Sequence, residues 1–128
     1  MAHTHDSDLS SLVYILNQTY ALKRRLRNCQ LPPGTLRPLE RIEEHLEHNL
    51  RLSDLPAGSG LTIDDPLGQK YDERRSDLEA EVISDGDGPP IVVDVLKPII
   101  RLSRGGQTDI IQRGVVTVSH RKAEENET

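Results

Sequence analysis

The sequence has no tryptophan and no phenylalanine, and only three tyrosines in 128 residues. The core must therefore be built from aliphatic side chains, and a chain of this length buries roughly two-thirds of its unfolded surface in one domain. The single cysteine, Cys29, has no partner within the chain for a disulfide. No apolar run is long enough for a signal peptide or a membrane span. We therefore expect a cytoplasmic protein.

An excess of basic residues is also lacking, because 16 Lys and Arg stand against 21 Asp and Glu, for a net charge of -5. Binding to a nucleic-acid backbone depends on many cations that neutralise phosphates, so we expect no nucleic-acid partner. The only basic concentration is Lys23, Arg24, Arg25 and Arg27. It fits either a solvated helix end, where cations complement the helix dipole, or a docking patch for an acidic partner.

Apolar residues at helical spacing predict a first helix that begins near Asp6–Asp8, after a disordered start at residues 1–5. They form two neighbouring stripes: a first stripe of Leu9, Leu12, Val13, Leu16 and Tyr20, and a second stripe of Ile15, Leu22, Leu26 and Cys29. Two stripes make an apolar face wider than one partner helix covers. Because Cys29 lies on the second stripe, we interpret it as a buried structural thiol rather than a nucleophile.

The segment Pro32-Pro33-Gly34 predicts the end of the first helix, and Thr35 is a candidate cap for a second helix with Pro38 in its first turn. Two helices joined by such a turn form an antiparallel hairpin, and hairpins from two copies bury their stripes as a four-helix bundle. We therefore predict a homodimer. The predicted dimerisation residues are Leu9, Leu12, Val13, Leu16, Tyr20, Leu39, Ile42, Leu46 and Leu50.

Beyond a linker at 51–60, we interpret residues 60–82 as a hinge between a helical and a β half of the chain. Short Val-rich and Ile-rich runs after it predict strands at 80–84, 91–97, 99–102, 109–113 and 115–119. The predicted fold class is α+β, with a helical hairpin at 1–59, a small all-β domain at 60–120 and a disordered tail at 121–128. The β-domain is the expected site of partner binding.

Few residues suggest chemistry. His45 and His48 lie three apart on a predicted helix, but no third metal ligand lies near them, so we interpret them as solvated or interface residues. Gly105-Gly106 lacks the Lys-Ser or Lys-Thr that follows a phosphate-binding loop, which favours a hairpin turn. The hydroxyls have no histidine placed by sequence to activate them. We predict a binding protein with no catalytic residue, no metal and no cofactor.

Four segments carry a family resemblance: Gly60-Leu61, Gly68-Gln69-Lys70-Tyr71-Asp72, Val92-Val93-Asp94-Val95-Leu96-Lys97, and the final run from Ile111 to Val118. In their order and spacing they resemble the C-terminal part of GrpE-type nucleotide exchange factors of DnaK-type chaperones. The match extends from Gly60 to about His120. Glu73 stands where that family has Pro, Ser76 where it has His, and Ile99-Ile100 where it has Gly-Tyr. The long paired helices that precede the bundle in that family have no counterpart in these residues.

The resemblance implies a dimeric co-chaperone of protein folding and the stress response. Its GrpE-like β-domain would bind the nucleotide-binding domain of a DnaK-type chaperone and promote ADP release without bond chemistry. The partner-binding residues implied by position are Gly60, Leu61, Val95, Leu96, Gln112, Arg113 and Val115. Two alternatives stay open: a non-enzymatic scaffold or regulatory adaptor that uses the same β-domain for another protein, and a small enzyme with a site at the dimer interface.

Overall fold

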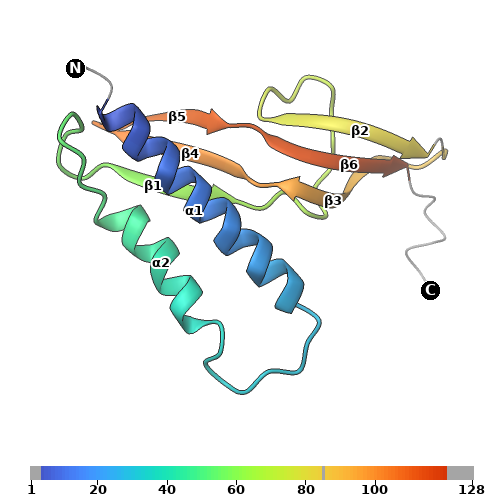
Figure 1. Cartoon of the computed structure of the whole chain (residues 1–128). Helices are drawn as coiled ribbons and strands as arrows, with labels where there is room; N and C mark the ends of the chain where they lie inside the picture. Colours follow the sequence, from blue (N-terminus) through green and yellow to red (C-terminus); the bar gives the residue numbers. More distant parts are fainter. Residues whose placement is uncertain (1–3, 85, 121–128) are drawn as a thin grey trace. The chain divides into compact units, whose positions relative to one another are not determined.

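The fold is mixed α+β. The computed structural model describes residues 4–84 and 86–120, and within them two helices precede six strands (Figure 1). The strands form two three-stranded sheets, in the orders β1-β4-β5 and β2-β6-β3. The bounds are α1 Thr4–Leu26, α2 Arg37–His48, β1 Gly60–Asp64, β2 Leu78–Ser84, β3 Pro90–Lys97, β4 Ile99–Arg104, β5 Gln107–Gln112 and β6 Gly114–His120.

The chain divides into two compact units that interleave along the sequence. The first contains the described residues up to Ile63 together with Arg101–Asp109. The second contains Asp64–Ile100 and the described residues from Ile110 onward. Both helices therefore belong to the first unit, and the whole of the β2-β6-β3 sheet belongs to the second. No helix among residues 4–84 and 86–120 is long and apolar enough to cross a membrane.

The first helix differs from its prediction at both ends. It begins at Thr4, so Asp8 lies inside it rather than at its cap, and Thr4 and His5 are helical rather than disordered. The other predicted disordered segments, residues 1–3 and 121–128, lie outside the described residues. The helix ends at Leu26, and Cys29 is exposed in the following turn, with its Sγ 3.8 Å from the carbonyl oxygen of Arg25. The interpretation of Cys29 as a buried thiol is therefore wrong, because the stripe stops before it.

The second helix begins at Arg37, with Pro38 in its first turn as predicted. Leu36 occupies the capping position and no side chain caps the helix, so the predicted role of Thr35 is wrong. The Thr35 hydroxyl instead donates a 2.7 Å hydrogen bond to the carbonyl oxygen of Pro32 and closes the turn. Because this local bond competes with capping, the helix starts one residue later than a Thr35 cap would place it.

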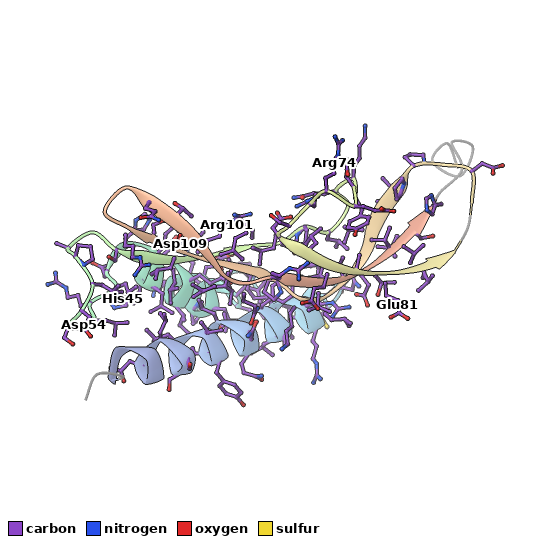
Figure 2. All side chains as sticks on the ribbon, turned by 90° about the horizontal axis from the view of Figure 1, so that it is seen from above. His45, Asp54, Arg74, Glu81, Arg101 and Asp109 are labelled. Atoms are coloured by element: carbon purple, nitrogen blue, oxygen red, sulfur yellow. The ribbon has the colours of Figure 1, made fainter. Side chains whose placement is uncertain are left out.

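The first apolar stripe of α1 faces the core of its own unit. Leu16 and Tyr20 are 1% and 6% exposed, and Leu46 and Leu50 from the α2 side are 8% and 5% exposed. The Lys23 ammonium and Glu43 carboxylate, 2.9 Å apart, join the two helices. Figure 2 shows side chains filling the space between the helices and the strands of this unit. Of the remaining predicted dimerisation residues, Leu9, Leu12, Val13 and Leu39 are half-buried and Ile42 is exposed.

The five predicted strands are all present, with ends within two residues of the predicted ones for most, and correspond to β2 to β6. β1 was not predicted, because its five residues offer only Leu61 and Ile63 as alternating apolar positions inside the expected hinge. Gly60, at its start, lies so close to the end of α2 that a Cβ there would overlap the Glu47 carbonyl oxygen. The hinge therefore contains a packed strand.

In the second unit, β6 is the central strand. It pairs in parallel with β2 and antiparallel with β3, so that Val116 lies between Ala80 and Val95, and Val118 lies between Val82 and Val92. Val92, Val95, Val116 and Val118 are at most 1% exposed. Val116 and Val118 alternate along β6, and the register shift between Val92 and Asp94 places Val92 and Val95 of β3 opposite them. This face of the β2-β6-β3 sheet is therefore the core of the unit.

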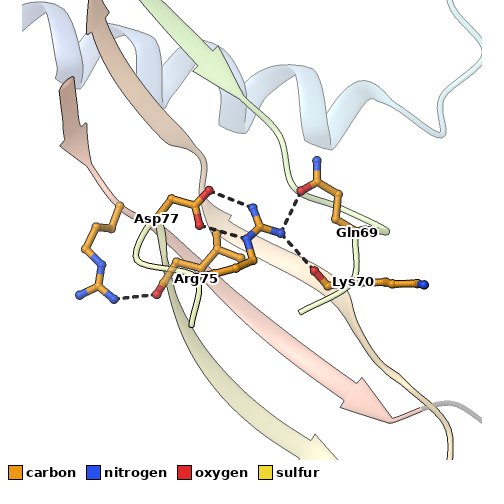
Figure 3. Close-up of polar contacts among 6 residues, drawn as sticks. Gln69, Lys70, Arg75 and Asp77 are labelled. Carbon is orange, nitrogen blue, oxygen red and sulfur yellow. Dashed lines mark hydrogen bonds and ion pairs between the residues drawn. The ribbon is translucent and has the colours of Figure 1, made fainter. Parts of the chain in front are cut away.

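The loop between β1 and β2 covers the outer edge of β3. Gly68 donates to the Val92 carbonyl oxygen, Val92 to that of Gln69, and Tyr71 to that of Pro90, each over 2.9 Å. Arg75 then ties the loop together: its guanidinium bonds both carboxylate oxygens of Asp77, at 3.0 and 2.9 Å, and the Gln69 side chain and Lys70 carbonyl oxygen, each at 3.1 Å (Figure 3). The loop that carries part of the family resemblance thus has a structural role here.

Candidate protein-binding surface

The face of the β2-β6-β3 sheet opposite its core is mainly polar. Glu79 of β2 and Lys97 of β3 both pair with Val115 of β6, so these three side chains form one row across the face. Glu81 and Asp94 flank Thr117 in the next row. Polar positions that alternate with core positions along a strand normally face water. Glu79 and Glu81, the β2 members of the two rows, are both exposed.

Leu96 interrupts this polarity. A register shift between Val95 and Lys97 leaves Leu96 without a partner residue in β6. Such a bulge re-aims side chains, and Leu96 is 58% exposed whereas Val95 next to it is 1% exposed. A large apolar side chain is therefore presented to solvent beside the Lys97 end of the first row.

Arg113 lies in the link between β5 and β6. Its Nη2 donates a 2.7 Å hydrogen bond to the Leu78 carbonyl oxygen, and its Nη1 lies 3.4 Å from the Glu79 carboxylate. The side chain is therefore held against the start of β2 while Arg113 itself stays exposed. The next residue is Gly114, where a Cβ would lie 2.8 Å from the Leu78 side chain. This close packing explains why a glycine follows Arg113.

Together these residues form what we call the sheet-end patch, consisting of Glu79, Leu96, Lys97, Arg113 and Val115. It combines two apolar side chains, Leu96 and Val115, with two cations and one carboxylate, a mixture found at protein-binding surfaces. Three of its members, Leu96, Arg113 and Val115, were predicted from sequence. Glu79 and Lys97 were missed, although their polar positions in otherwise apolar strands are the signal that marks the exposed face.

The other four predicted partner-binding residues lie elsewhere. Val95 is in the core of the second unit, and Leu61, 1% exposed, is in the core of the first. Gly60 packs against the Glu47 carbonyl oxygen. The Gln112 side-chain amide donates a 2.9 Å hydrogen bond to the Pro98 carbonyl oxygen. In this conformation these four residues stabilise the fold. On the second unit, Leu96 and Arg113 are exposed to a partner, whereas Val95 is buried.

The loop beside the sheet carries one strongly shifted acid. Arg74 donates side-chain and main-chain hydrogen bonds to the Asp72 carboxylate, and these bonds lower the Asp72 pKa from its ordinary 3.8 to about 2. The same pairing raises the pKa of Arg74. Both groups are exposed, so this ion pair stabilises a turn at the surface and places no charge in the core.

The two predicted helical histidines are exposed, and His48 Nε2 lies 3.8 Å from a carboxylate oxygen of Glu47. Among the residues described, no three His, Cys, Asp or Glu side chains are grouped so that they could hold a metal ion. His45 lines an open groove of about 590 Å³ in the first unit, whose other lining residues include four leucines. Figure 2 shows His45 near one end of that unit.

No protein-family model, curated protein or solved structure matches this chain.

Proposed function

We propose that this protein is a non-enzymatic adaptor that binds another protein through the sheet-end patch. In line with its sequence resemblance, we further propose that the partner is the nucleotide-binding domain of a DnaK-type chaperone and that binding promotes ADP release. The observation that carries the proposal is that Leu96 and Arg113 are exposed, and Val115 is half-buried, at the same end of the β2-β6-β3 sheet. The sequence resemblance implies all three as partner-binding positions.

The patch contains one residue type, arginine, that is enriched at binding hot spots. Arg113 is already oriented by its 2.7 Å bond to the Leu78 carbonyl oxygen. A preoriented arginine loses less conformational freedom when it binds an acidic group of a partner. Leu96 is 58% exposed, so its burial against a partner adds a hydrophobic contribution.

The mechanism needs only a difference in affinity. An adaptor that binds the open form of a nucleotide cleft more tightly than the closed form shifts the population toward opening, and bound ADP then leaves faster. By reciprocity, nucleotide that favours the closed form lowers the affinity for the adaptor by the same factor. No side chain of the adaptor has to touch the nucleotide.

One observation favours the second candidate, an adaptor that uses the same patch for a different protein. Ile99 and Ile100, which stand where the resembled family has Gly-Tyr, are 2% and 0% exposed. They therefore offer no surface to a partner. An interface on the sheet-end patch therefore has fewer contact positions than one that also included positions 99 and 100.

Stopped-flow release of fluorescent ADP from DnaK-type chaperones separates the two candidates. The exchange-factor proposal expects the wild-type chain to accelerate release, and Leu96→Asp to abolish the acceleration because a buried carboxylate would face the partner. Leu67→Asp is the matched control, since Leu67 is also exposed, at 43%, in a loop of the same unit. It should accelerate release as the wild type does.

Binding to the same chaperones is measured in parallel. Unchanged release rates with every chaperone, together with a pulled-down partner of another class that loses affinity for Leu96→Asp, would establish the adaptor alternative. Equal loss for Leu96→Asp and Leu67→Asp would remove the sheet-end patch from either proposal.

A further inference from the structure

β2 is an open edge of the β2-β6-β3 sheet. Among residues 4–84 and 86–120, it is the terminal strand in the sheet order and pairs only with β6. Within the same residues, the main-chain hydrogen bonds outside helices and strands include none to the outer side of β2. The opposite edge, β3, is covered by the loop from Gly68 to Tyr71. The part of the chain that the structure describes thus covers one edge of this sheet and leaves the other available.

The open edge carries exposed apolar residues. Val82 pairs with Val118 and lies on the core face, yet it is 48% exposed because no described strand pairs with the outer side of β2. Ile83 lies at a register shift between Val82 and Ser84 and is 60% exposed. Unpaired strand edges with β-branched apolar residues are templates for pairing with another chain.

Charge decides what kind of chain fits. Glu79 and Glu81 occupy alternate positions on β2, so both carboxylates lie on the polar face, while Ala80 and Val82 lie on the core face. The Glu81 side chain projects from its strand and is exposed (Figure 2). A strand added beside β2 would place one set of alternate residues next to Glu79 and Glu81 on the polar face, and the other set next to Ala80 and Val82 on the core face. Basic residues would face the glutamates, and small apolar residues would face Ala80 and Val82.

We infer that β2 binds an extended segment of a partner protein by strand addition, and that this segment alternates Lys or Arg with small apolar residues. Main-chain hydrogen bonds to the β2 edge give affinity, and the carboxylates of Glu79 and Glu81 favour segments that carry basic residues. A second copy of β2 is disfavoured as the occupant, since antiparallel pairing centred on Glu81 sets like charges opposite each other. The inference does not rest on the proposed chaperone function. It uses Glu81, Val82 and Ile83, which lie outside the sheet-end patch, together with Glu79, which belongs to it.

The test uses the full chain and three labelled synthetic peptides. The first is Thr-Lys-Val-Lys-Val-Thr, the second replaces both lysines with glutamate, and the third is the basic peptide with alternate backbone nitrogens methylated. Fluorescence anisotropy should show binding of the basic peptide at least about tenfold tighter than of either other peptide. Hydrogen exchange should show that the basic peptide slows exchange of amides within residues 79–83 by about tenfold or more.

Two protein variants sharpen the result. Glu81→Lys should reduce affinity for the basic peptide by about tenfold and raise affinity for the acidic one. Glu44→Lys, an exposed position on α2 with the same change of charge, should alter neither. Because the peptide comparison is made on the unmodified protein, the test stands even where a variant folds poorly.

Three outcomes overturn the inference. If the methylated peptide binds as well as the basic one, the attraction is only electrostatic and no strand is added. If protection appears outside residues 79–83, the peptide binds elsewhere. If those amides are already protected in free protein in a concentration-dependent manner, a second copy occupies the edge.

Discussion

The α-carbon of Gly60 lies so close to the main-chain carbonyl oxygen of Glu47 that a β-carbon there would overlap that oxygen. Gly60→Ala should therefore force β1 away from the end of α2. We expect a loss of about 3 kcal/mol in the free energy of unfolding, at the upper end of overpacking effects, measured by urea denaturation.

Gly58→Ala is the control for Gly60→Ala. A Cβ at Gly58 meets nothing within 4 Å, although its φ of 86° favours glycine. Its cost should be limited to backbone strain of about 1 kcal/mol. A Gly60→Ala protein as stable as the wild type but weaker in partner binding would instead place Gly60 at the interface, as the sequence resemblance implies.

Arg75 and Arg74 are adjacent arginines with opposite surroundings. The Arg75 side chain is 24% exposed in its ion pair with Asp77, whereas the Arg74 side chain is 91% exposed. Arg75→Ala removes the guanidinium bonds to the Asp77 carboxylate and the Lys70 carbonyl oxygen and should cost about 2–3 kcal/mol. Arg74→Ala should change stability by no more than about 0.5 kcal/mol. Equal costs in thermal or urea unfolding would show that the Arg75 network does not hold the loop.

Asp72 should titrate well below an ordinary aspartate, because Arg74 bonds its carboxylate and holds its pKa near about 2. A lowered pKa in the folded state stabilises the turn above the ordinary value of 3.8, and this contribution is lost as the pH falls toward about 2. An NMR titration of the Asp72 carboxyl carbon measures this directly. Arg74→Ala should raise the midpoint toward the ordinary value, and Arg104→Ala, which removes the ion pair with Asp109, should leave it unchanged.

Much of the β half could be predicted from sequence because it follows simple alternation. Val116 and Val118 alternate with Thr117 along β6, and this period of two alone identifies both the strand and its buried face. The pairing of β6 with β2 and β3 has no such local signal. This pairing depends on contacts between residues far apart in the chain. Single members of the sheet-end patch could therefore be predicted from sequence, but their arrangement in space could not.

The wrong predictions concern positions where a helix end, a local hydrogen bond or strand pairing decides the outcome, and the periodic pattern of apolar residues contains none of this information. Cys29 fits the helical stripe, but α1 stops at Leu26 and leaves the thiol exposed. Thr35 fits a cap, but its hydroxyl bonds Pro32 instead. Val95 and Leu96 are equivalent in the family resemblance, but neighbouring strand residues point to opposite faces, and Val95 is 1% exposed whereas Leu96 is 58% exposed. Which of the two faces is the core depends on the pairing of β3 with β6, a tertiary feature with no signature in these residues.

The second stripe of α1 is the surface on which a homodimer should depend. Four predicted dimerisation residues, Leu16, Tyr20, Leu46 and Leu50, are buried within their own unit and cannot meet another copy without opening it. Ile15 and Leu22, seven residues apart on α1, are 44% and 46% exposed. Residues at this spacing share one helix face, so they form the apolar surface that a second copy would cover.

We therefore expect a dimer at micromolar concentration by light scattering, and Leu22→Glu should convert it to a monomer with an unchanged circular dichroism spectrum. A charge in an apolar helix interface costs far more than the same charge in water. Leu67→Glu, at an exposed leucine in the second unit, should stay dimeric. Leu46→Ala should leave the surface intact but lower the stability of each protomer by about 2–5 kcal/mol, because it opens a cavity in the core. A wild-type monomer, or a Leu22→Glu dimer, would reject this interface.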